Sequence, residues 1–228
     1  MRIAITRIPG KGARDAGICQ KYGHECYTVS PLRVELYPDR VREFVEAANR
    51  GELDCIFFVS AVPARVMGPL LTSPPRVIAI GPQTARTLAK SGIRVETLPA
   101  FYSRALVPYL GEWIRGRRIG IPRADVPNPA LITAIEGAGG IPVEVRCYRL
   151  VPTGTPLSTD GADALLFTSG TSFREAAWTP RPGLLLMAIG EVTAAAMREG
   201  GAPPAVVGDG SLEGTLGALD RFLQGAGR

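Results

Sequence analysis

Short, uniformly apolar segments recur along the chain, and Gly, Pro or Ser residues bound most of them. Runs this short and this uniformly apolar are typical of parallel strands that are covered on both faces. The clearest segments are residues 3–5, 55–59, 77–80, 119–121, 164–167 and 184–189. Weaker segments at residues 25–29, 94–98, 142–145 and 205–207 bring the predicted strands to ten.

Helical patterns lie between these strands, with apolar positions spaced three or four residues apart. Strand and helix alternate throughout the chain, and this alternation predicts an α/β fold with parallel sheets. The predicted helices cover residues 38–49, 83–91, 130–137, 191–199 and 213–224.

The chain also contains an internal repeat, which predicts two small α/β domains with five strands each. Residues 54–60 (DCIFFVS) return as residues 163–169 (DALLFTS), and residues 78–85 (IAIGPQTA) return at the same offset as residues 187–194 (MAIGEVTA). A third pair, at a slightly larger offset, joins residues 2–7 (RIAITR) to residues 118–123 (RIGIPR).

How the repeated segments are shared between the two domains has two solutions. Extended stretches at residues 27–37 and 143–151 could pair antiparallel as a connection, so that one domain is inserted into the other. The alternative is a simple split near residue 115. The residues alone leave both solutions open.

Composition and charge narrow the functional classes. The hydrophobic fraction of 46% and charged fraction of 21% are those of an ordinary globular protein. No apolar run approaches the roughly 20 residues that span a bilayer, and no signal-peptide pattern precedes the first strand, so a cytoplasmic protein without membrane contact is expected. The net charge of +5, carried mostly by Arg, suits an anionic partner, although it could serve solubility alone. Without a basic run interleaved with aromatic residues, nucleic acid is not expected.

Cysteine and histidine usage argues against metal and triad chemistry. The four cysteines, at positions 19, 26, 55 and 147, show no C-x-x-C spacing, and we expect buried free thiols. The single histidine, His24, lies in a turn-like segment and is expected at the surface. One histidine cannot provide a His-based metal site or a Ser-His-Asp triad.

Polar and glycine residues follow several predicted strands, where an open parallel sheet binds its ligand. Glycine lets a ligand approach the backbone, and free N–H groups at a helix start favour anions. The same residues could instead be ordinary helix caps and turns. The candidates are Ser60, Gly81, Thr84, Thr168, Ser169, Gly170, Thr171, Gly190 and Thr193.

Several short motifs follow one another in order along nearly the whole chain. They are Thr6-Arg7-x-Pro9, Phe58-x-Ser60 and Phe167-x-Ser169, the two Ile-Gly-x-x-Thr-Ala segments, Pro122-Arg123-Ala-Asp125 and Val145-x-x-Tyr148. In their order and spacing they resemble the uroporphyrinogen-III synthase family. The resemblance implies two flavodoxin-like domains with parallel five-stranded sheets, joined by a two-stranded linker. Domain one would be discontinuous, residues 1–33 plus 152–228, domain two would be residues 37–146, and the linkers would lie at about residues 30–37 and 145–152.

The resemblance also implies an activity. A family member is a lyase of tetrapyrrole biosynthesis that cyclises hydroxymethylbilane to uroporphyrinogen III, with loss of water and inversion of ring D. It would act as a monomer without a cofactor or metal, on a path to heme, siroheme or cobalamin, and would contact hydroxymethylbilane synthase transiently. The competing hypothesis is a non-catalytic two-domain binding protein for a small anionic ligand.

Three residues receive roles from this resemblance. Tyr148 occupies the position of the family's tyrosine, where a phenol could donate a proton to the departing hydroxyl; packing between linker and sheet is the alternative. Arg7 and Arg123 occupy equivalent strand ends and could bind substrate carboxylates, or could be solvated at the surface. The chain departs from the family at Glu191 and Val192, where an acid at a helix start would compete with an anionic ligand.

Overall fold

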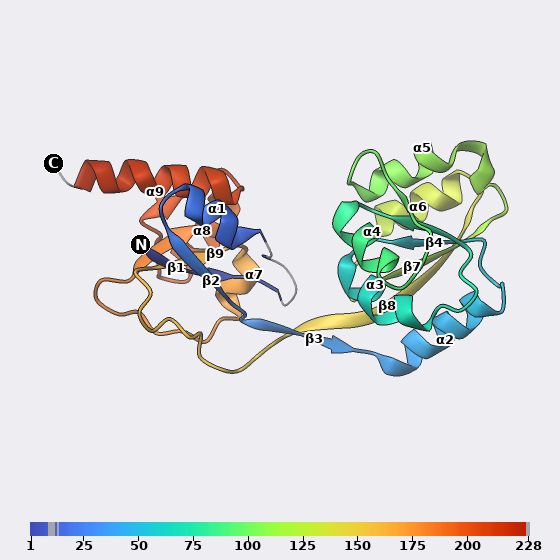
Figure 1. Ribbon diagram of the computed structural model, residues 1–228, viewed down its shortest axis with the longest axis horizontal. Helices are drawn as coiled ribbons and strands as arrows, with labels where there is room; N and C mark the ends of the chain where they lie inside the picture. Colours follow the sequence, from blue (N-terminus) through green and yellow to red (C-terminus); the bar gives the residue numbers. More distant parts are fainter. Residues whose placement is uncertain (9–11, 13, 227–228) are drawn as a thin grey trace. The chain divides into compact units, whose positions relative to one another are not determined.

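The computed structural model of the protein describes residues 1–8, 12 and 14–226 of the chain. By its internal contacts the chain divides into two compact units, which Figure 1 shows. Unit 1 comprises Met1–Val34 and Val151–Arg228, and unit 2 comprises Glu35–Leu150. Each unit is a mixed α/β structure, and the predicted α/β class with parallel strands is confirmed.

Unit 1 is built on a five-stranded sheet with the order β11-β10-β9-β1-β2, in which the neighbouring strands run parallel. In Figure 1 its elements carry the colours of both ends of the chain. Its strands are β1 (Arg2–Thr6), β2 (Glu25–Val29), β9 (Ala164–Phe167), β10 (Leu185–Ala188) and β11 (Val206–Val207). Its helices are α1 (Asp15–Lys21), α7 (Gly170–Arg174), α8 (Glu191–Glu199) and α9 (Leu212–Ala226).

Both faces of this sheet are buried, as the uniformly apolar strands require. Ile3 and Ile5 of β1 pack with residues of α1 and α9, whereas Ala4, between them, packs with residues of α7 and α8. Successive side chains of a strand point to opposite faces, so each face needs its own apolar set. An edge-on contact between Phe167 and Phe173, with ring centroids 5.2 Å apart, joins β9 to α7.

Unit 2 contains most of a six-stranded sheet with the order β3-β8-β7-β4-β5-β6. The pairs β8-β7, β7-β4, β4-β5 and β5-β6 are parallel. The strands are β3 (Leu32–Leu36), β4 (Cys55–Phe58), β5 (Arg76–Ala79), β6 (Glu96–Thr97), β7 (Arg118–Ala124) and β8 (Ile141–Pro152). The helices are α2 (Pro38–Asn49), α3 (Ala61–Met67), α4 (Pro82–Ala89), α5 (Leu106–Leu110) and α6 (Pro129–Gly137), with 3₁₀ turns η1 (Gly68–Leu70), η2 (Ser103–Ala105) and η3 (Gly111–Ile114).

Helix α2 packs on the sheet through the apolar stripe that its sequence predicts. Pro38 occupies its first turn, where a missing N–H costs nothing, and a buried stripe at Val41, Phe44, Val45 and Ala48 has helical spacing. The Phe44 ring packs on β7 at Gly120, where a Cβ atom would lie only 2.7 Å from Cζ. The apolar neighbours Ile119 and Ile121 point to the other face, toward α5 and α6.

The internal repeat occupies equivalent places in the two sheets. Residues 54–60 and 163–169 run along β4 and β9, each of which lies next to the strand carrying the Arg-Ile-x-Ile segment. Omitting β3, the orders β2-β1-β9-β10-β11 and β8-β7-β4-β5-β6 therefore correspond strand by strand. The prediction of five strands in the second sheet is wrong, because Leu32–Leu36 adds a sixth strand beside β8.

Four short helices, α1, α3, α5 and α7, were not predicted. Each has five to seven residues, too few to show a helical period, and α3 carries Pro63 as its third residue. Strand β8 is longer than predicted, because residues 142–145 and the extended stretch after them form one strand through Pro152.

The cysteines are free as predicted, with Cys19, Cys55 and Cys147 buried and Cys26 half-buried. The prediction for His24 is wrong, since its side chain is only 7% exposed. Its Nε2 atom lies 3.3 Å from Oδ1 of Asp220, and its Nδ1 atom lies 3.3 Å from the nitrogen of Met1. Within the described residues, no helix is long and apolar enough to cross a membrane. The same residues contain no group of three or more His, Cys, Asp or Glu side chains that could hold a metal ion.

Candidate functional site

Two hydroxyl groups meet at the carboxyl ends of the strands in unit 2. Ser60 lies two residues after the end of β4, in extended conformation, and directly precedes α3. Its Oγ atom lies 3.3 Å from the hydroxyl oxygen of Tyr148 on β8. Either oxygen can be the donor in this hydrogen bond. Sequence reasoning singled out both residues, and the fold brings them together across 88 positions of sequence.

Tyr148 is buried, and its environment keeps its proton in place. Burial raises the pKa of Tyr148 above the ordinary value for a phenol, and the hydrogen bond with Ser60 offsets part of that rise. The hydroxyl is therefore protonated at neutral pH, so that it can donate a hydrogen bond or a proton.

Strand geometry fixes the backbone of Tyr148. A register shift between Arg123 and Ala124 places Tyr148 opposite Ala124, and the carbonyl oxygen of Tyr148 accepts a 2.7 Å hydrogen bond from the N–H of Asp125. The carboxylate of Asp125 is held by Arg146 at 3.1 Å and by the hydroxyl of Tyr37 at 3.2 Å. The end of β7 is thus tied firmly to β8.

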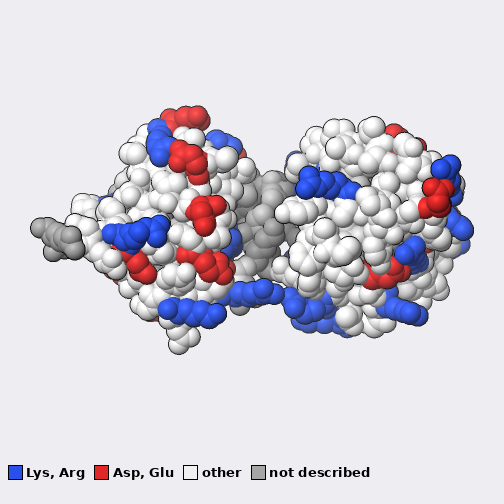
Figure 2. All heavy atoms as spheres, turned by 90° about the horizontal axis from the view of Figure 1, so that it is seen from above, with Lys and Arg blue, Asp and Glu red and all other residues white. Residues whose placement is uncertain are grey.

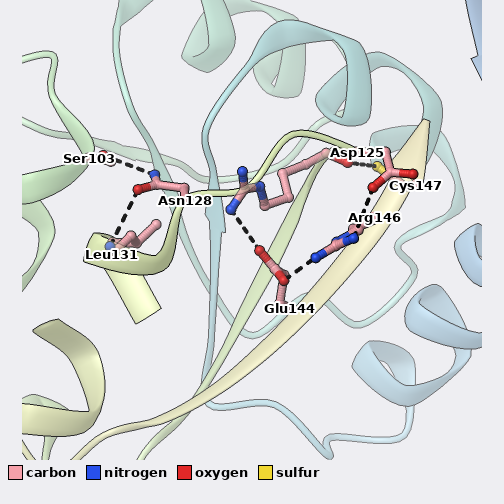
Figure 3. A network of polar contacts seen from close by, with 8 residues as sticks. Ser103, Asp125, Asn128, Leu131, Glu144, Arg146 and Cys147 are labelled. Carbon is pink, nitrogen blue, oxygen red and sulfur yellow. Dashed lines mark hydrogen bonds and ion pairs between the residues drawn. The ribbon is translucent and has the colours of Figure 1, made fainter. Parts of the chain in front are cut away.

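Arg123 belongs to this tie and is not a solvated surface residue. Its side chain is 8% exposed, and its Nη1 atom lies 2.7 Å from Oε1 of Glu144. Glu144 also contacts Arg146, and the Cys147 thiol donates to the carbonyl oxygen of Arg123 at 3.2 Å (Figure 3). The side chain thus forms an internal ion pair between β7 and β8.

Arg7 behaves in the same way in unit 1. Its Nε and Nη2 atoms lie 2.8 Å and 3.1 Å from the two carboxylate oxygens of Asp15, a bidentate pair with 20% of the Arg7 side chain exposed. The alternative that Arg7 and Arg123 are solvated is therefore wrong. Both guanidinium groups already bind a carboxylate of their own unit.

The two Ile-Gly-x-x-Thr-Ala motifs place their glycines and threonines alike. Gly81 and Gly190 follow β5 and β10 in extended conformation, and Thr84 and Thr193 are buried inside the first turn of α4 and α8. A Cβ atom at Gly190 would lie 3.1 Å from the nitrogen of Gly210, so a side chain there would crowd the neighbouring loop. In each motif, the groups open to a ligand are therefore the backbone and the two residues between the glycine and the threonine. The threonine hydroxyls are buried and are not open to a ligand.

The remaining candidates lie after β9 in unit 1. The Thr168 hydroxyl donates to the carbonyl oxygen of Thr6, and the Thr168 N–H donates to Thr6 Oγ1 at 3.0 Å. Ser169 caps α7, since its Oγ atom accepts from the N–H of Ser172 at 3.0 Å. These two hydroxyls are used within the unit, whereas Thr171 is exposed.

Sequence reasoning missed Arg174, which lies over this loop. A Cβ atom at Gly170 would be 3.2 Å from Nη1 of Arg174, so the guanidinium group covers the glycine. A spacing of four residues on a helix is the signal that could have found this contact, but α7 is too short to be recognised from its pattern. Unlike Arg7 and Arg123, Arg174 has no ion-pair partner among the described residues.

Glu191, at the start of α8, competes less with an anionic ligand for the N–H groups there than its sequence position suggests. Its carboxylate lies 2.5 Å from Nη1 of Arg198, on the next turns of α8. Acidic and basic side chains both appear on each unit in the view of Figure 2. Some of the basic side chains are thus neutralised in ion pairs such as that between Glu191 and Arg198.

Comparisons with known proteins agree on one family. The family model described as Uroporphyrinogen-III synthase HemD matches residues 14–216. A curated protein of Methanothermobacter thermautotrophicus, named "Putative uroporphyrinogen-III synthase", is 25% identical over 174 residues, which are 72% of this chain and 67% of that protein.

Solved structures show the same fold. A uroporphyrinogen-III synthetase from Helicobacter pylori matches with a TM-score of 0.57 at 17% identity, covering 98% of this chain and 99% of that one. A mutant uroporphyrinogen III synthase from Thermus thermophilus matches with a TM-score of 0.54 at 21% identity, covering 99% of each chain. Because the family model matches well over half of its residues, this chain belongs to the uroporphyrinogen-III synthase family.

Proposed function

We propose that the protein is a uroporphyrinogen-III synthase that cyclises hydroxymethylbilane to uroporphyrinogen III, with loss of water and inversion of ring D. Family membership supports an enzyme of porphyrin synthesis that acts on a small molecule. The observation that carries the specific reaction is the buried, protonated hydroxyl of Tyr148 beside Ser60. Such a group suits a reaction whose first step is the departure of a hydroxyl group.

The proposed chemistry needs one proton donor and strict positioning. The pyrrole nitrogen pushes electrons toward the terminal hydroxymethyl carbon, the C–O bond breaks, and Tyr148 gives its proton to the departing hydroxyl, which leaves as water. The substituted carbon of ring D then attacks, and the spiro intermediate fragments and recloses with ring D inverted. Loss of the ring proton on closure returns a proton to the phenolate, so the net products are uroporphyrinogen III and water. Holding the bilane in this geometry is the enzyme's main task.

The substrate carries carboxylates, and we propose that the strand ends of each unit, taken by itself, offer groups that bind a carboxylate. In unit 2 these groups come from Ser60 and the backbone after Gly81, and in unit 1 from the backbone of Gly170 and Gly190, from Thr171 and from Arg174. Free N–H groups at the start of α4 and α8 favour anions. Thr84, Thr168, Ser169 and Thr193 support these loops from inside, and Arg7 and Arg123 position the strand ends through their ion pairs.

We also propose that the two units are flavodoxin-like domains, with residues 1–33 plus 152–228 as domain one and residues 37–146 as domain two. Linkers would lie at about residues 30–37 and 145–152. The strand orders support this, because each corresponds to the 2-1-3-4-5 order of that fold when β1 and β7 are taken as first strands.

We propose further that this lyase works in the cytoplasm as a monomer without a cofactor and meets hydroxymethylbilane synthase only transiently.

The product isomer tests the function directly. Purified protein mixed with freshly generated hydroxymethylbilane should give mainly the type III isomer, measured by chromatography after oxidation. Without enzyme, closure occurs at the free carbon of ring D and gives type I. Type I alone, at the rate of a protein-free control, would overturn the proposal, and binding of the bilane without faster closure would identify a non-catalytic binding protein.

A further inference from the structure

The most exposed large apolar side chains of the described chain share one kind of position. Val192, Tyr102, Val126 and Phe101 are 87%, 63%, 58% and 57% exposed, and each closely follows the carboxyl end of a strand. The other exposed large apolar residues reach at most 49%. Three of the four, Phe101, Tyr102 and Val126, belong to unit 2 and follow its strands β6 and β7.

Phe101 and Tyr102 are held at this edge by a well-anchored segment. Leu98 and Leu106 on either side are buried in the core, and the N–H of Ala105 donates to the carbonyl oxygen of Tyr102 at 2.9 Å. Asn128, which caps α6 after β7, contacts Ser103 at 3.5 Å (Figure 3). The backbone is therefore fixed while both aromatic rings stay largely in solvent.

The Phe101 ring lies directly against the backbone of Gly81. A Cβ atom at Gly81 would be 3.4 Å from Cδ1 and 3.5 Å from Cγ of that ring. Glycine thus lets the ring sit beside the β5–α4 loop, next along the sheet from β4, where Ser60 meets Tyr148. An exposed ring in that place extends the surface that a ligand of the Ser60–Tyr148 pair would cover.

Arg104 adds a positive charge to the same segment. Its guanidinium carbon lies 5.1 Å from the centroid of the Tyr102 ring, and no carboxylate of the described residues lies within ion-pairing distance of it. Arg76 offers a contrast, because it stacks on Trp113 but also binds Glu96 at 2.7 Å. Arg104 is thus oriented by an aromatic ring while its charge has no acidic partner there.

We infer that Phe101, Tyr102 and Arg104 form a subsite for one pyrrole ring of the substrate and an acid side chain of that ring. The inference rests on the proposed function. Phe101 presents an apolar π-surface that suits a flat, electron-rich heterocycle. Arg104 offers the planar fork that binds a carboxylate. Ring and carboxylate recognition side by side fit a substituted pyrrole better than a free carboxylic acid or a plain hydrocarbon.

Steady-state kinetics of variants test the subsite. Phe101→Leu keeps an apolar side chain over Gly81 and removes the ring, and Arg104→Gln removes the charge. Each should raise the KM for hydroxymethylbilane about fivefold to twentyfold and leave kcat within about twofold, because the lost contact is made equally in the ground and transition states. Phe222→Leu on α9 and Lys90→Gln after α4 remove an exposed ring and an exposed charge elsewhere, and should change neither constant.

Equilibrium binding separates this inference from the proposed function. Uroporphyrin III, titrated by its absorbance, should bind the parent protein and bind both subsite variants about fivefold to twentyfold more weakly, whether or not turnover occurs. If the parent binds uroporphyrin III but forms no type III isomer, the function fails and the subsite stands. The subsite is overturned if both variants bind like the parent, or if kcat falls while KM and binding stay unchanged. Thermal unfolding of each variant, expected within a few degrees of the parent, excludes misfolding as the cause.

Discussion

The proposed role of Tyr148 as a proton donor depends on the uncharged hydroxyl group beside it. Its hydrogen bond is to the hydroxyl of Ser60, and not to a carboxylate that would compete for its proton. Burial then keeps the phenol protonated, because the charged form would lose its hydration. A general acid that acts once on a labile leaving group needs little more than this.

Replacing Tyr148 by Phe should separate chemistry from packing. The ring remains and only the hydroxyl is lost, so turnover should fall by up to about 10²-fold, the low end for a positioned general acid, because the substrate is itself reactive. The free energy of unfolding should drop by only about 1 kcal/mol for the lost hydrogen bond. Turnover within about twofold of the parent, or a rate loss matched by a large loss of stability, would make Tyr148 a structural residue.

Cys147 gives a residue-scale prediction for alkaline pH. Burial raises the pKa of this thiol from 9.0 to about 11. The folded state therefore keeps a proton that the unfolded chain releases above pH 9, so the contribution to stability is full below pH 9 and is lost as pH rises to about 11. That loss amounts to roughly 2–3 kcal/mol. Urea unfolding should therefore show the free energy of unfolding of the parent falling between pH 8 and 11. The free energy of unfolding of Cys147→Ala should fall by about 2–3 kcal/mol less over the same range. If the free energies of both proteins changed with pH in the same way, the prediction would be contradicted.

Some single-residue environments could not be read from the sequence. Arg7 and Arg123 were identified by motif, but their acid partners come from a neighbouring helix and strand, which only the fold brings near. His24 looked like a surface turn residue, and its contact with Asp220, far along the chain, could not be read from its local sequence. Tyr148 was found through family resemblance, since nothing in its local pattern distinguishes a proton donor from a packed aromatic residue.

At the scale of elements, the repeated strands β1 and β7 show how one pattern adapts to two neighbours. The repeat aligns Ala4 on β1 with Gly120 on β7, and both are buried. On β7 the space that a methyl group would need is taken by the rings and branches of Phe44 and Leu53, 2.7 Å and 2.8 Å from a Cβ position. Glycine at this point allows α2 to pack closely on the sheet.

Gly120→Ala should therefore destabilise the protein by about 1–3 kcal/mol through overpacking. Gly137→Ala provides the matched control, because it lies in α6 with nothing within 4 Å of a Cβ position. That change should stabilise by roughly 0.5–1 kcal/mol, since alanine favours helix. Chemical denaturation measures both, and an unchanged midpoint for Gly120→Ala would show that Phe44 can move aside.

Helices and strands were predicted correctly where the pattern of neighbouring residues was enough to identify them. Uniformly apolar runs located the strands, and the stripe of α2 located that helix to the residue. Helices of five to seven residues carry no period, so α1, α3, α5 and α7 could not be seen. The extended stretches at residues 27–37 and 143–151 were proposed as partners, and β3 does lie beside β8. The residues alone did not reveal that this pairing adds β3 to the sheet of unit 2, because an isolated extended segment carries no signal for the sheet it joins.

At the scale of the whole molecule, unit 2 is formed by one continuous stretch of chain. The buried cluster around Phe57, Ile78 and Ile121 draws only on residues of that stretch. A fragment of residues 30–152 keeps β3 and β8 complete and should fold alone, with an α/β circular dichroism spectrum and one cooperative thermal transition. A fragment that shows no cooperative transition would mean that unit 2 depends on unit 1.

Strand β1 lies between β2 and β9 in its sheet, and this position sets an order of events during synthesis. Ile3 to Ile5 are synthesised well before the strand that pairs with their second edge, which begins at Ala164. At the usual 5–20 residues per second, these apolar residues wait roughly ten to thirty seconds with one edge unpaired, while unit 2 can already be complete. The nascent chain should therefore depend on chaperone protection of its first strand, and slowing translation before residue 164 should lower the yield of folded protein.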